Sequence, residues 1–157
     1  MLFSPLTLSI GVGLVIGLLF VEFLGLSVGG MVVPGYIALV AAEPITIILT
    51  LLTAVLVFVT VRILSNSLVI YGKRRIAVTV LLSFIFGAII RMILSSVFVV
   101  SSLGEVYTVI GYIIPGLIAI SFDRQGVIET TTTLIIAAVV VRLLLIVFIG
   151  PALLGAA

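Results

Sequence analysis

The sequence contains no cysteine and no histidine among its 157 residues. Thiol nucleophiles, disulfides, Cys/His zinc sites and imidazole general bases are therefore excluded within this chain. Only five acidic residues are present, and these are Glu22, Glu43, Glu105, Asp123 and Glu129. None of them forms the close pair that a two-carboxylate hydrolase or a two-metal site requires. We therefore expect no catalytic residue, metal site or cofactor in this chain, although it can still be a subunit of an enzyme.

Charge is scarce as well, because 8% of the residues are charged and 64% are hydrophobic. A soluble domain has about a quarter of its residues charged, and the mean hydropathy of this chain is +1.68. So few charges cannot cover a surface that faces water, and the surface must therefore face lipid. The sequence predicts an all-α integral membrane protein of the cell membrane, formed by one membrane domain over residues 1–157. The net charge of +2 is too small to indicate a nucleic-acid partner.

Hydrophobic runs divide the chain into spans and breaks. A helix needs roughly 20 apolar residues to cross the hydrocarbon core. Runs of that order extend over Pro5–Val21, Pro44–Leu64, Ile76–Leu103 and Val127–Ile149. Two further runs are interrupted by a Pro-Gly step, and these are Val28–Ala42 and Val109–Phe122.

The order of these runs repeats. Gly30–Ala38 aligns without a gap with Gly111–Ala119, and Gly, Pro, Gly, Ile and Ala coincide. This match predicts two duplicated halves, at about residues 1–72 and 73–157. Each half would hold two transmembrane helices flanking a Pro-Gly-broken segment that is re-entrant or kinked.

The densest basic cluster, Lys73-Arg74-Arg75, is expected on the cytoplasmic side. If the two Pro-Gly segments are re-entrant, each half has two full spans and the halves run parallel. If both segments cross, the protein has six short spans and inverted halves, and Asp123-Arg124 is also cytoplasmic. The segment lengths favour the re-entrant arrangement, and the sequence leaves the number of crossings open.

The Pro-Gly steps suggest a place for a ligand. Proline lacks an N–H and breaks a helix, and backbone groups freed in this way must be buried in protein or line a wet cavity. If Pro34 and Pro115 begin half-helices, the N–H groups that follow them, starting at Gly35 and Gly116, would attract an anion. Packing kinks are the alternative interpretation.

Three arginines lie in or near the hydrophobic runs. Arg91 and Arg142 are well inside their runs, where an arginine costs about 2.5 to 3.5 kcal/mol on insertion scales. Each should therefore meet an acid, carbonyl groups or water, and Glu22 and Glu129 are the available carboxylates. The arginines either line a path for an anion or snorkel to the headgroups, and snorkelling is the preferred interpretation for Arg62.

Small and hydroxyl residues indicate helix contacts. Gly13 and Gly17 have the GxxxG spacing that lets helices approach closely, and so do Gly25 and Gly29. The run Thr130–Thr133 can hydrogen-bond to its own helix or to a neighbour.

Several of these motifs resemble one known family. Val32–Val40, Tyr71–Arg75, Ile114–Ala119 and Arg124-Gln125-Gly126 resemble, in the same order, the signatures of the small membrane subunit of poly-γ-glutamate synthases, the PgsC/CapC family. The length of the chain is similar to that of the family, and the resemblance covers nearly the whole chain. Arg62, Arg142 and the Glu129–Thr133 stretch depart from the family pattern.

The resemblance implies a set of partners. These are a cytoplasmic, ATP-dependent amide ligase of the Mur-ligase type (PgsB/CapB), an extracytoplasmic anchored subunit (PgsA/CapA) and the anionic polymer poly-γ-glutamate. ATP and Mg²⁺ would belong to the ligase and not to this chain. A homo-oligomer is also possible.

These observations lead to one functional prediction and one alternative. The chain is expected to be a non-catalytic membrane subunit of a poly-γ-glutamate synthesis and export complex, which anchors the ligase and helps to form the polymer passage. The expected path residues are Glu22, Pro34, Gly35, Arg91, Pro115, Gly116 and Arg124, and the expected docking residues are Tyr71, Gly72, Lys73, Arg74 and Arg75. The alternative is an autonomous small transporter or channel for an anionic solute.

Overall fold

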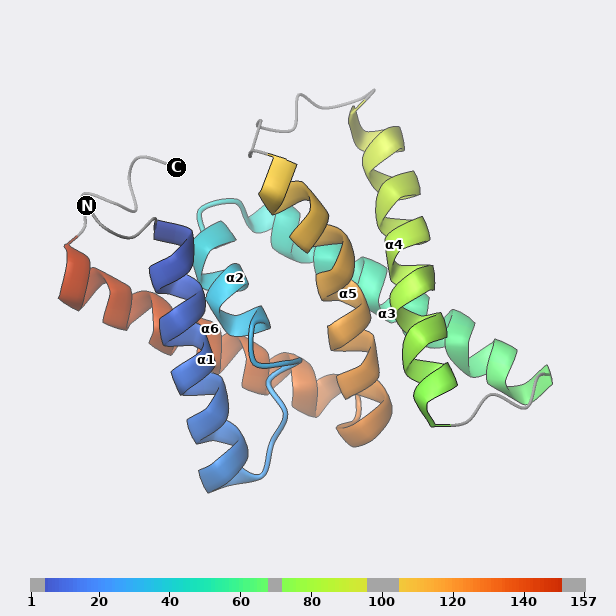
Figure 1. The fold of residues 1–157 in the computed structure, drawn as a ribbon, viewed down its shortest axis with the longest axis horizontal. Coiled ribbons are helices and arrows are strands. Elements are labelled where there is room, and N and C mark those ends of the chain that lie inside the picture. The colour runs from blue at the N-terminus through green and yellow to red at the C-terminus, as the bar shows by residue number, and fades with distance from the viewer. Residues whose placement is uncertain (1–4, 68–71, 96–104, 151–157) are drawn as a thin grey trace. The chain divides into compact units, whose positions relative to one another are not determined.

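The computed structural model describes residues 5–67, 72–95 and 105–150, and these residues form six α-helices and no strand. The helices are α1 (Pro5–Leu24), α2 (Val33–Val40), α3 (Pro44–Ser67), α4 (Lys73–Ser95), α5 (Glu105–Gln125) and α6 (Val127–Ile149), as Figure 1 shows. The prediction of an all-helical chain is confirmed.

Four helices are long and apolar enough to cross a membrane, and these are α1, α3, α4 and α6. They coincide with the four long hydrophobic runs of the sequence. Helix α2 has eight residues and is about 12 Å long, so it cannot cross the hydrocarbon core by itself. The expectation of a membrane protein is therefore supported by the lengths and composition of these four helices.

The start of α3 shows how the sequence sets a helix boundary. Pro44 occupies the first helical position, where its fixed φ suits a helix and its missing N–H is not needed. The Glu43 carbonyl accepts a hydrogen bond from the Thr46 N–H at 3.1 Å. The Glu43 carboxylate accepts a second one from Thr46 Oγ1 at 3.0 Å. The first bond satisfies a backbone N–H that a helix start would otherwise leave unpaired, and the second holds the two side chains together.

A single residue, Gly126, separates α5 from α6. Its φ of 98° lies in a region that side-chain-bearing residues rarely adopt, which explains the need for glycine here. The Gly126 N–H donates to the Phe122 carbonyl at 3.0 Å, and the Gly126 carbonyl accepts from the Thr130 N–H at 3.3 Å. Both helix ends are thereby closed within one sharp turn.

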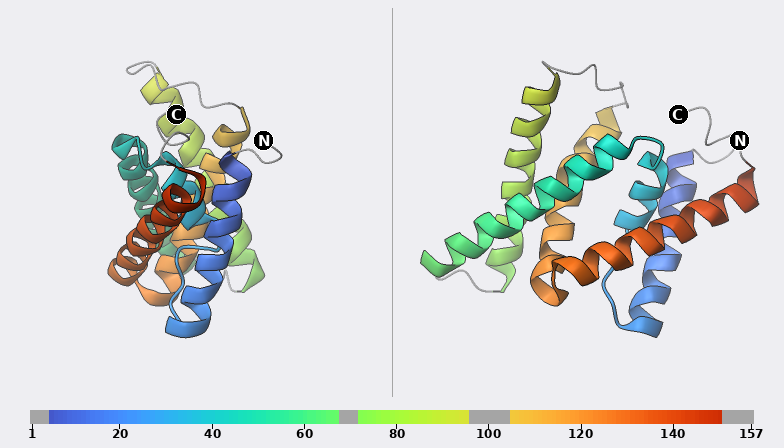
Figure 2. Two further views of the ribbon diagram at one scale, coloured as in Figure 1. Left: turned by 90° about the vertical axis from the view of Figure 1, so that its left-hand side faces the viewer. Right: turned by 180° about the vertical axis from the view of Figure 1, so that it is seen from behind.

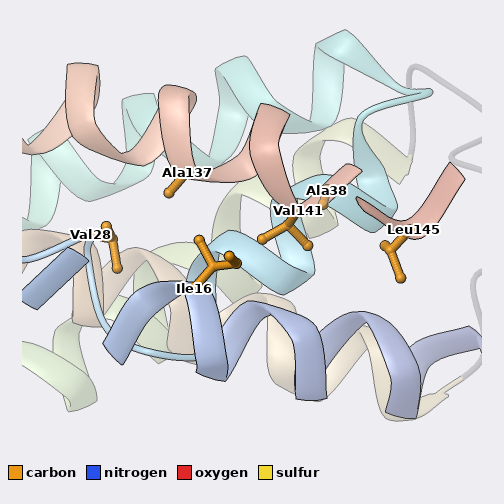
Figure 3. Close-up of a cluster of buried hydrophobic side chains, with 6 residues drawn as sticks. All are labelled: Ile16, Val28, Ala38, Ala137, Val141 and Leu145. Atoms are coloured by element: carbon orange, nitrogen blue, oxygen red, sulfur yellow. The ribbon is translucent and has the colours of Figure 1, made fainter. Parts of the chain in front are cut away.

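The chain divides into two compact units. The first unit contains residues 1–48 and 121–157, and the second contains residues 49–120. In the first unit α1, α2 and α6 pack against one another, and α2 lies beside α1 in both views of Figure 2. A cluster of buried apolar side chains lies between these helices (Figure 3), and its members are Ile16, Val28, Ala38, Ala137, Val141 and Leu145.

Helices α1 and α2 run antiparallel at very short range. A methyl group on Gly13 would lie 2.6 Å from Cα of Gly35, and one on Gly17 would lie 3.3 Å from Cα of Met31. The later residue of α1, Gly17, thus lies against the earlier residue of the following segment, Met31. The two segments therefore run in opposite directions. The Gly13–Gly17 pair faces this segment, as its spacing predicts. Gly25, in contrast, lies in the loop after α1 and has no such contact.

The loop between α1 and α2 covers residues 25–32, and part of it is buried. Val28 is 1% exposed and Gly29 is also buried. Because α2 starts beside Gly13, near the middle of α1, this loop extends back along half the length of α1. Non-helical backbone within a membrane must be covered by protein or line a wet cavity, and this loop is covered at Val28 and Gly29.

The second unit has its own apolar core. Val57 and Val61 of α3 pack with Ala119 of α5, and three partly buried side chains surround them, namely Phe58, Leu82 and Phe86. Helices α4 and α5 also meet directly, because Ser83 Oγ donates a hydrogen bond to the Tyr112 carbonyl at 2.7 Å. All three helices of this unit therefore contribute to its packing.

The expected helix break at Pro115 is absent. Helix α5 begins ten residues earlier, at Glu105, and continues through Pro115 to Gln125. A proline inside a helix removes one backbone hydrogen bond. Helix α4 packs against this part of α5, and Ser83 donates a hydrogen bond to the carbonyl of Tyr112, three residues before the proline. Pro34, in contrast, does lie in the first turn of a short helix, which is one of the two arrangements that the sequence left open.

Candidate functional site

Both Pro-Gly steps are buried, and both lie against a serine of the preceding long helix. Ser9 Oγ donates to the Gly35 carbonyl at 2.6 Å, and a methyl group on Gly35 would lie 2.5 Å from the Ser9 carbonyl oxygen. A methyl group on Gly116 would lie 2.8 Å from Cβ of Ser83. The two glycines thus permit close helix contacts. Pro115 does not begin a half-helix, so the condition for an anion site at Gly116 is not met, and an anion-binding role at Gly35 stays a prediction.

Arg91 lies within the candidate span of α4 and is half-buried. Its Cζ atom is 5.5 Å from the centroid of the Tyr112 ring on α5, which is within the range of a cation–π contact. The sequence places one acid in the second unit, Glu105 at the start of α5, and its side chain lies outside the described part of the structure. An acid, carbonyl groups or water were expected next to Arg91, and the contact that the structure describes for its guanidinium is with an aromatic ring.

The other two arginines differ from Arg91 in their surroundings. Arg62 is exposed, and its Cζ atom lies 6.0 Å from the Phe58 ring one turn earlier on the same helix. An exposed guanidinium that covers its own helix fits the snorkelling interpretation. Arg142 is half-buried on α6, and Glu129 is exposed at the start of that helix.

Gln125 forms a two-point contact with the backbone of the α1–α2 loop. Its Oε1 accepts a hydrogen bond from the Ser27 N–H at 2.8 Å, and its Nε2 donates one to the Ser27 carbonyl at 2.5 Å. The hydroxyls of Ser27 and Ser121 lie 3.0 Å apart and share a third hydrogen bond. These contacts connect the end of α5 to the loop that leads into α2. Sequence reasoning did not find them, because 98 positions separate Gln125 from Ser27.

The charged path residues of the first unit lie on its surface. Glu22 near the end of α1 and Arg124 at the end of α5 are both exposed. The Arg124-Gln125-Gly126 motif therefore combines an exposed cation, a side chain that binds the loop and a glycine with positive φ.

The basic docking segment is described from Gly72 onward, and Tyr71 lies outside the described residues. Gly72 has a φ of 62°, and its carbonyl accepts a hydrogen bond from the Arg75 N–H at 3.1 Å. Lys73 and Arg74 are exposed in the first turn of α4. Their charges are therefore accessible to a partner at this end of the helix.

The threonine run hydrogen-bonds to its own helix. Each of Thr130, Thr131, Thr132 and Thr133 donates its hydroxyl to the carbonyl four residues earlier, at distances of 2.7 or 2.8 Å. This is the first of the two expected arrangements. Among the described residues no three acidic side chains gather as a metal site.

Comparison with known proteins identifies related sequences. A profile of the capsule biosynthesis CapC family matches residues 12–131. The chain is 34% identical over 130 residues to the PGA biosynthesis protein CapC of Bacillus subtilis (strain 168), which covers 81% of this chain and 84% of the relative. It is 33% identical over 126 residues to the capsule biosynthesis protein CapC of Bacillus anthracis, with coverages of 78% and 81%. No solved structure matches the chain.

Proposed function

The chain belongs to the CapC family of capsule biosynthesis proteins, as its motifs predict, and on this premise we propose that it is a non-catalytic membrane subunit of a poly-γ-glutamate synthesis and export complex. In this proposal it anchors an ATP-dependent glutamate ligase of the Mur-ligase type at the cytoplasmic face. It also forms part of the passage for the polymer, and an extracytoplasmic anchored subunit completes the complex. ATP and Mg²⁺ are bound by the ligase.

We further propose that both Pro-Gly segments cross the membrane. Helix α5 has 21 residues without a break and is about 32 Å long, which is enough for one crossing. The α1–α2 loop together with α2 runs antiparallel to α1 and extends along it. Six crossings then place the loop before Lys73 and the turn at Gly126 on the same side. Four of the seven basic residues, Lys73, Arg74, Arg75 and Arg124, lie at these two connections, and this agrees with a cytoplasmic location.

Equivalent contacts support the duplication of two halves. A serine and a glycine four positions apart, Ser9 and Gly13 on α1, face the first Pro-Gly segment. The corresponding pair on α4, Ser83 and Gly87, faces the second segment. In both halves the serine donates to a backbone carbonyl near the Pro-Gly step. An odd number of crossings in each half makes the two halves inverted.

The observation that carries the passage role is the position of Arg91. It is 18 residues beyond Lys73 on one helix, so it lies about 27 Å from the basic segment along the helix axis. The hydrocarbon core is about 30 Å thick, so Arg91 then lies near the extracytoplasmic end of the candidate span, which ends at Ile93. At such a position the guanidinium can reach the headgroup layer as well as a polymer that leaves the passage. Its described contact is with the Tyr112 ring, and we propose that its charge attracts the carboxylates of a passing polymer.

The two cytoplasmic connections have separate roles in this proposal. The exposed charges of Lys73 and Arg74 attract the ligase, together with the neighbouring Tyr71, Gly72 and Arg75. Arg124 offers the nascent polyanion a positive charge at the entrance, and the exposed carboxylate of Glu22 limits how tightly the polymer is held there. Pro34, Gly35, Pro115 and Gly116 maintain the close packing that shapes the passage.

Coexpression tests the function directly. The ligase and the anchored subunit are expressed in a host without such genes, with or without this chain, and the polymer is quantified in cells and medium. We expect polymer only when the chain is present. A full yield without the chain would refute the proposal. The chain alone in liposomes should not move glutamate or its oligomers, and transport there would instead support an autonomous transporter.

A further inference from the structure

Tyr112 is held by four residues that share one face of α4. Ser83 Oγ donates to the Tyr112 carbonyl at 2.7 Å, and the Phe84 ring meets the Tyr112 ring edge to face with centroids 5.3 Å apart. A methyl group on Gly87 would lie 3.0 Å from Cδ1 of Tyr112, so the missing side chain makes room for the ring. The fourth residue, Arg91, lies over the ring face. Helix α4 therefore fixes the position of this tyrosine.

The side chains of Arg91 and Tyr112 carry hydrogen-bond donors for which the described residues provide no acceptor. A guanidinium that lies over a ring uses its face for the cation–π contact and keeps its N–H groups free at its edge. The Tyr112 hydroxyl makes no hydrogen bond with any residue that the structure describes. A phenol O–H and a guanidinium next to each other are suited to a planar anion such as a carboxylate.

The first half has no such pair at the corresponding place. On α4, Arg91 comes eight positions after Ser83, and on α1, Gly17 comes eight positions after Ser9. In the aligned short segments, Tyr112 corresponds to Met31, and Gly17 lies against Met31 as Arg91 lies against Tyr112. The two halves thus share a packing arrangement but differ in chemistry at this one contact.

We infer that Arg91 and Tyr112 form a carboxylate-binding site in the second half, in which Tyr112 orients the guanidinium and supplies a second donor. Gly17 and Met31 serve packing only. The inference rests on the proposed function, because each residue of a γ-linked glutamate polymer keeps one free carboxylate that can bind here. The phosphate of an anionic lipid is the other anion that a membrane offers to such a site.

Binding measurements in lipid nanodiscs test the site. The complex that contains the full chain is placed in nanodiscs of zwitterionic lipid only, and the affinity for labelled γ-linked glutamate oligomers is measured. Arg91→Gln should weaken binding by about tenfold or more, as expected for the loss of charge-assisted hydrogen bonds. Tyr112→Phe keeps the ring and should weaken binding by about three- to tenfold, and Tyr112→Leu should weaken it further. The matched control Met31→Leu should change the affinity by less than about twofold.

The alternative outcomes are distinct. Equal oligomer affinity for the wild type, Arg91→Gln and Tyr112→Phe would overturn the inference even if coexpression shows that the chain is required. The inference would also be overturned if anionic lipid displaced the bound oligomer and added oligomer could not displace the lipid. If the Arg91→Gln complex does not assemble, Tyr112→Phe and Arg91→Lys still test the inference. Both variants keep the positive charge at position 91 and remove some of the hydrogen-bond donors. Loss of binding in these variants, combined with a dispensable chain in coexpression, would support the site and refute only the proposed function.

Discussion

The side-chain amide of Gln125 binds both backbone groups of Ser27, although the two residues are 98 positions apart. An amide is the side chain that can accept from an N–H and donate to a carbonyl of the same residue. The contact fixes the loop that runs back along α1 to the start of α2. The Arg124-Gln125-Gly126 motif therefore has a structural role in addition to its exposed charge.

Replacing Gln125 by alanine should lower the free energy of unfolding by about 2 kcal/mol, because two hydrogen bonds of about 1 kcal/mol each are lost. The measurement is the melting temperature of the purified chain in detergent. Asn66→Ala removes an exposed amide from α3 and should change stability by less than about 0.5 kcal/mol. Equal melting temperatures for the two variants would show that the contact with Ser27 contributes nothing.

Two glycines of α1 make a matched pair for testing its contact with α2. A methyl group at Gly13 would meet the Gly35 backbone at 2.6 Å, whereas one at Gly11 has no heavy atom within 4 Å. Gly13→Ala should therefore destabilise the protein by about 1 to 3 kcal/mol. Gly11→Ala should leave stability unchanged or raise it by up to about 1 kcal/mol, because alanine is the better helix former. Thermal unfolding of both variants checks this, and a tolerated Gly13→Ala would contradict the described packing.

The absence of native cysteine makes the number of crossings easy to test. With six crossings, Glu43→Cys lies outside and Lys73→Cys lies inside. A membrane-impermeant maleimide added to intact cells should label Glu43→Cys only, and both should react after the cells are opened. Asp123→Cys should behave like Lys73→Cys. Labelling of Asp123→Cys in intact cells would contradict the crossing of α5.

The basic segment should bind the ligase through its charges. If the two basic side chains bind an acidic surface of the ligase, the double variant Lys73→Glu/Arg74→Glu should lower the amount of ligase that copurifies with the membrane subunit by about tenfold or more, since like charges at an interface cost several kcal/mol. Arg62→Gln removes one exposed positive charge from α3 and should leave copurification intact. Full ligase recovery with the double variant would place the docking surface elsewhere.

Much of the helix pattern can be predicted from the sequence because it depends on local signals. Helices α1 and α3 begin at Pro5 and Pro44, and α6 lies between Gly126 and Gly150. Long apolar runs mark the four candidate spans. Local signals were misleading at Pro115, where contact with α4 accompanies an uninterrupted helix. The outcome at such a proline depends on tertiary packing, which no local pattern contains.

The candidate site was predicted only in part for the same reason. Arg91 could be found because a charge in an apolar run is conspicuous. Tyr112 could not be found, since an aromatic residue in such a run is ordinary and its importance comes from Ser83, Phe84 and Gly87 on another helix. Gln125 was noticed as part of a motif, but its partner Ser27 was not.

The central claim is that the polymer crosses the membrane past Arg91, and transport by inverted membrane vesicles tests it most directly. Inside-out vesicles that contain the complex receive ATP and labelled glutamate, and polymer protected in the vesicle lumen is separated from polymer outside. We expect the wild-type complex to accumulate polymer in the lumen. An assembled Arg91→Gln complex should accumulate at most about a tenth of that amount, and Met31→Leu should behave as the wild type. Equal lumenal polymer for the wild type and Arg91→Gln would contradict it.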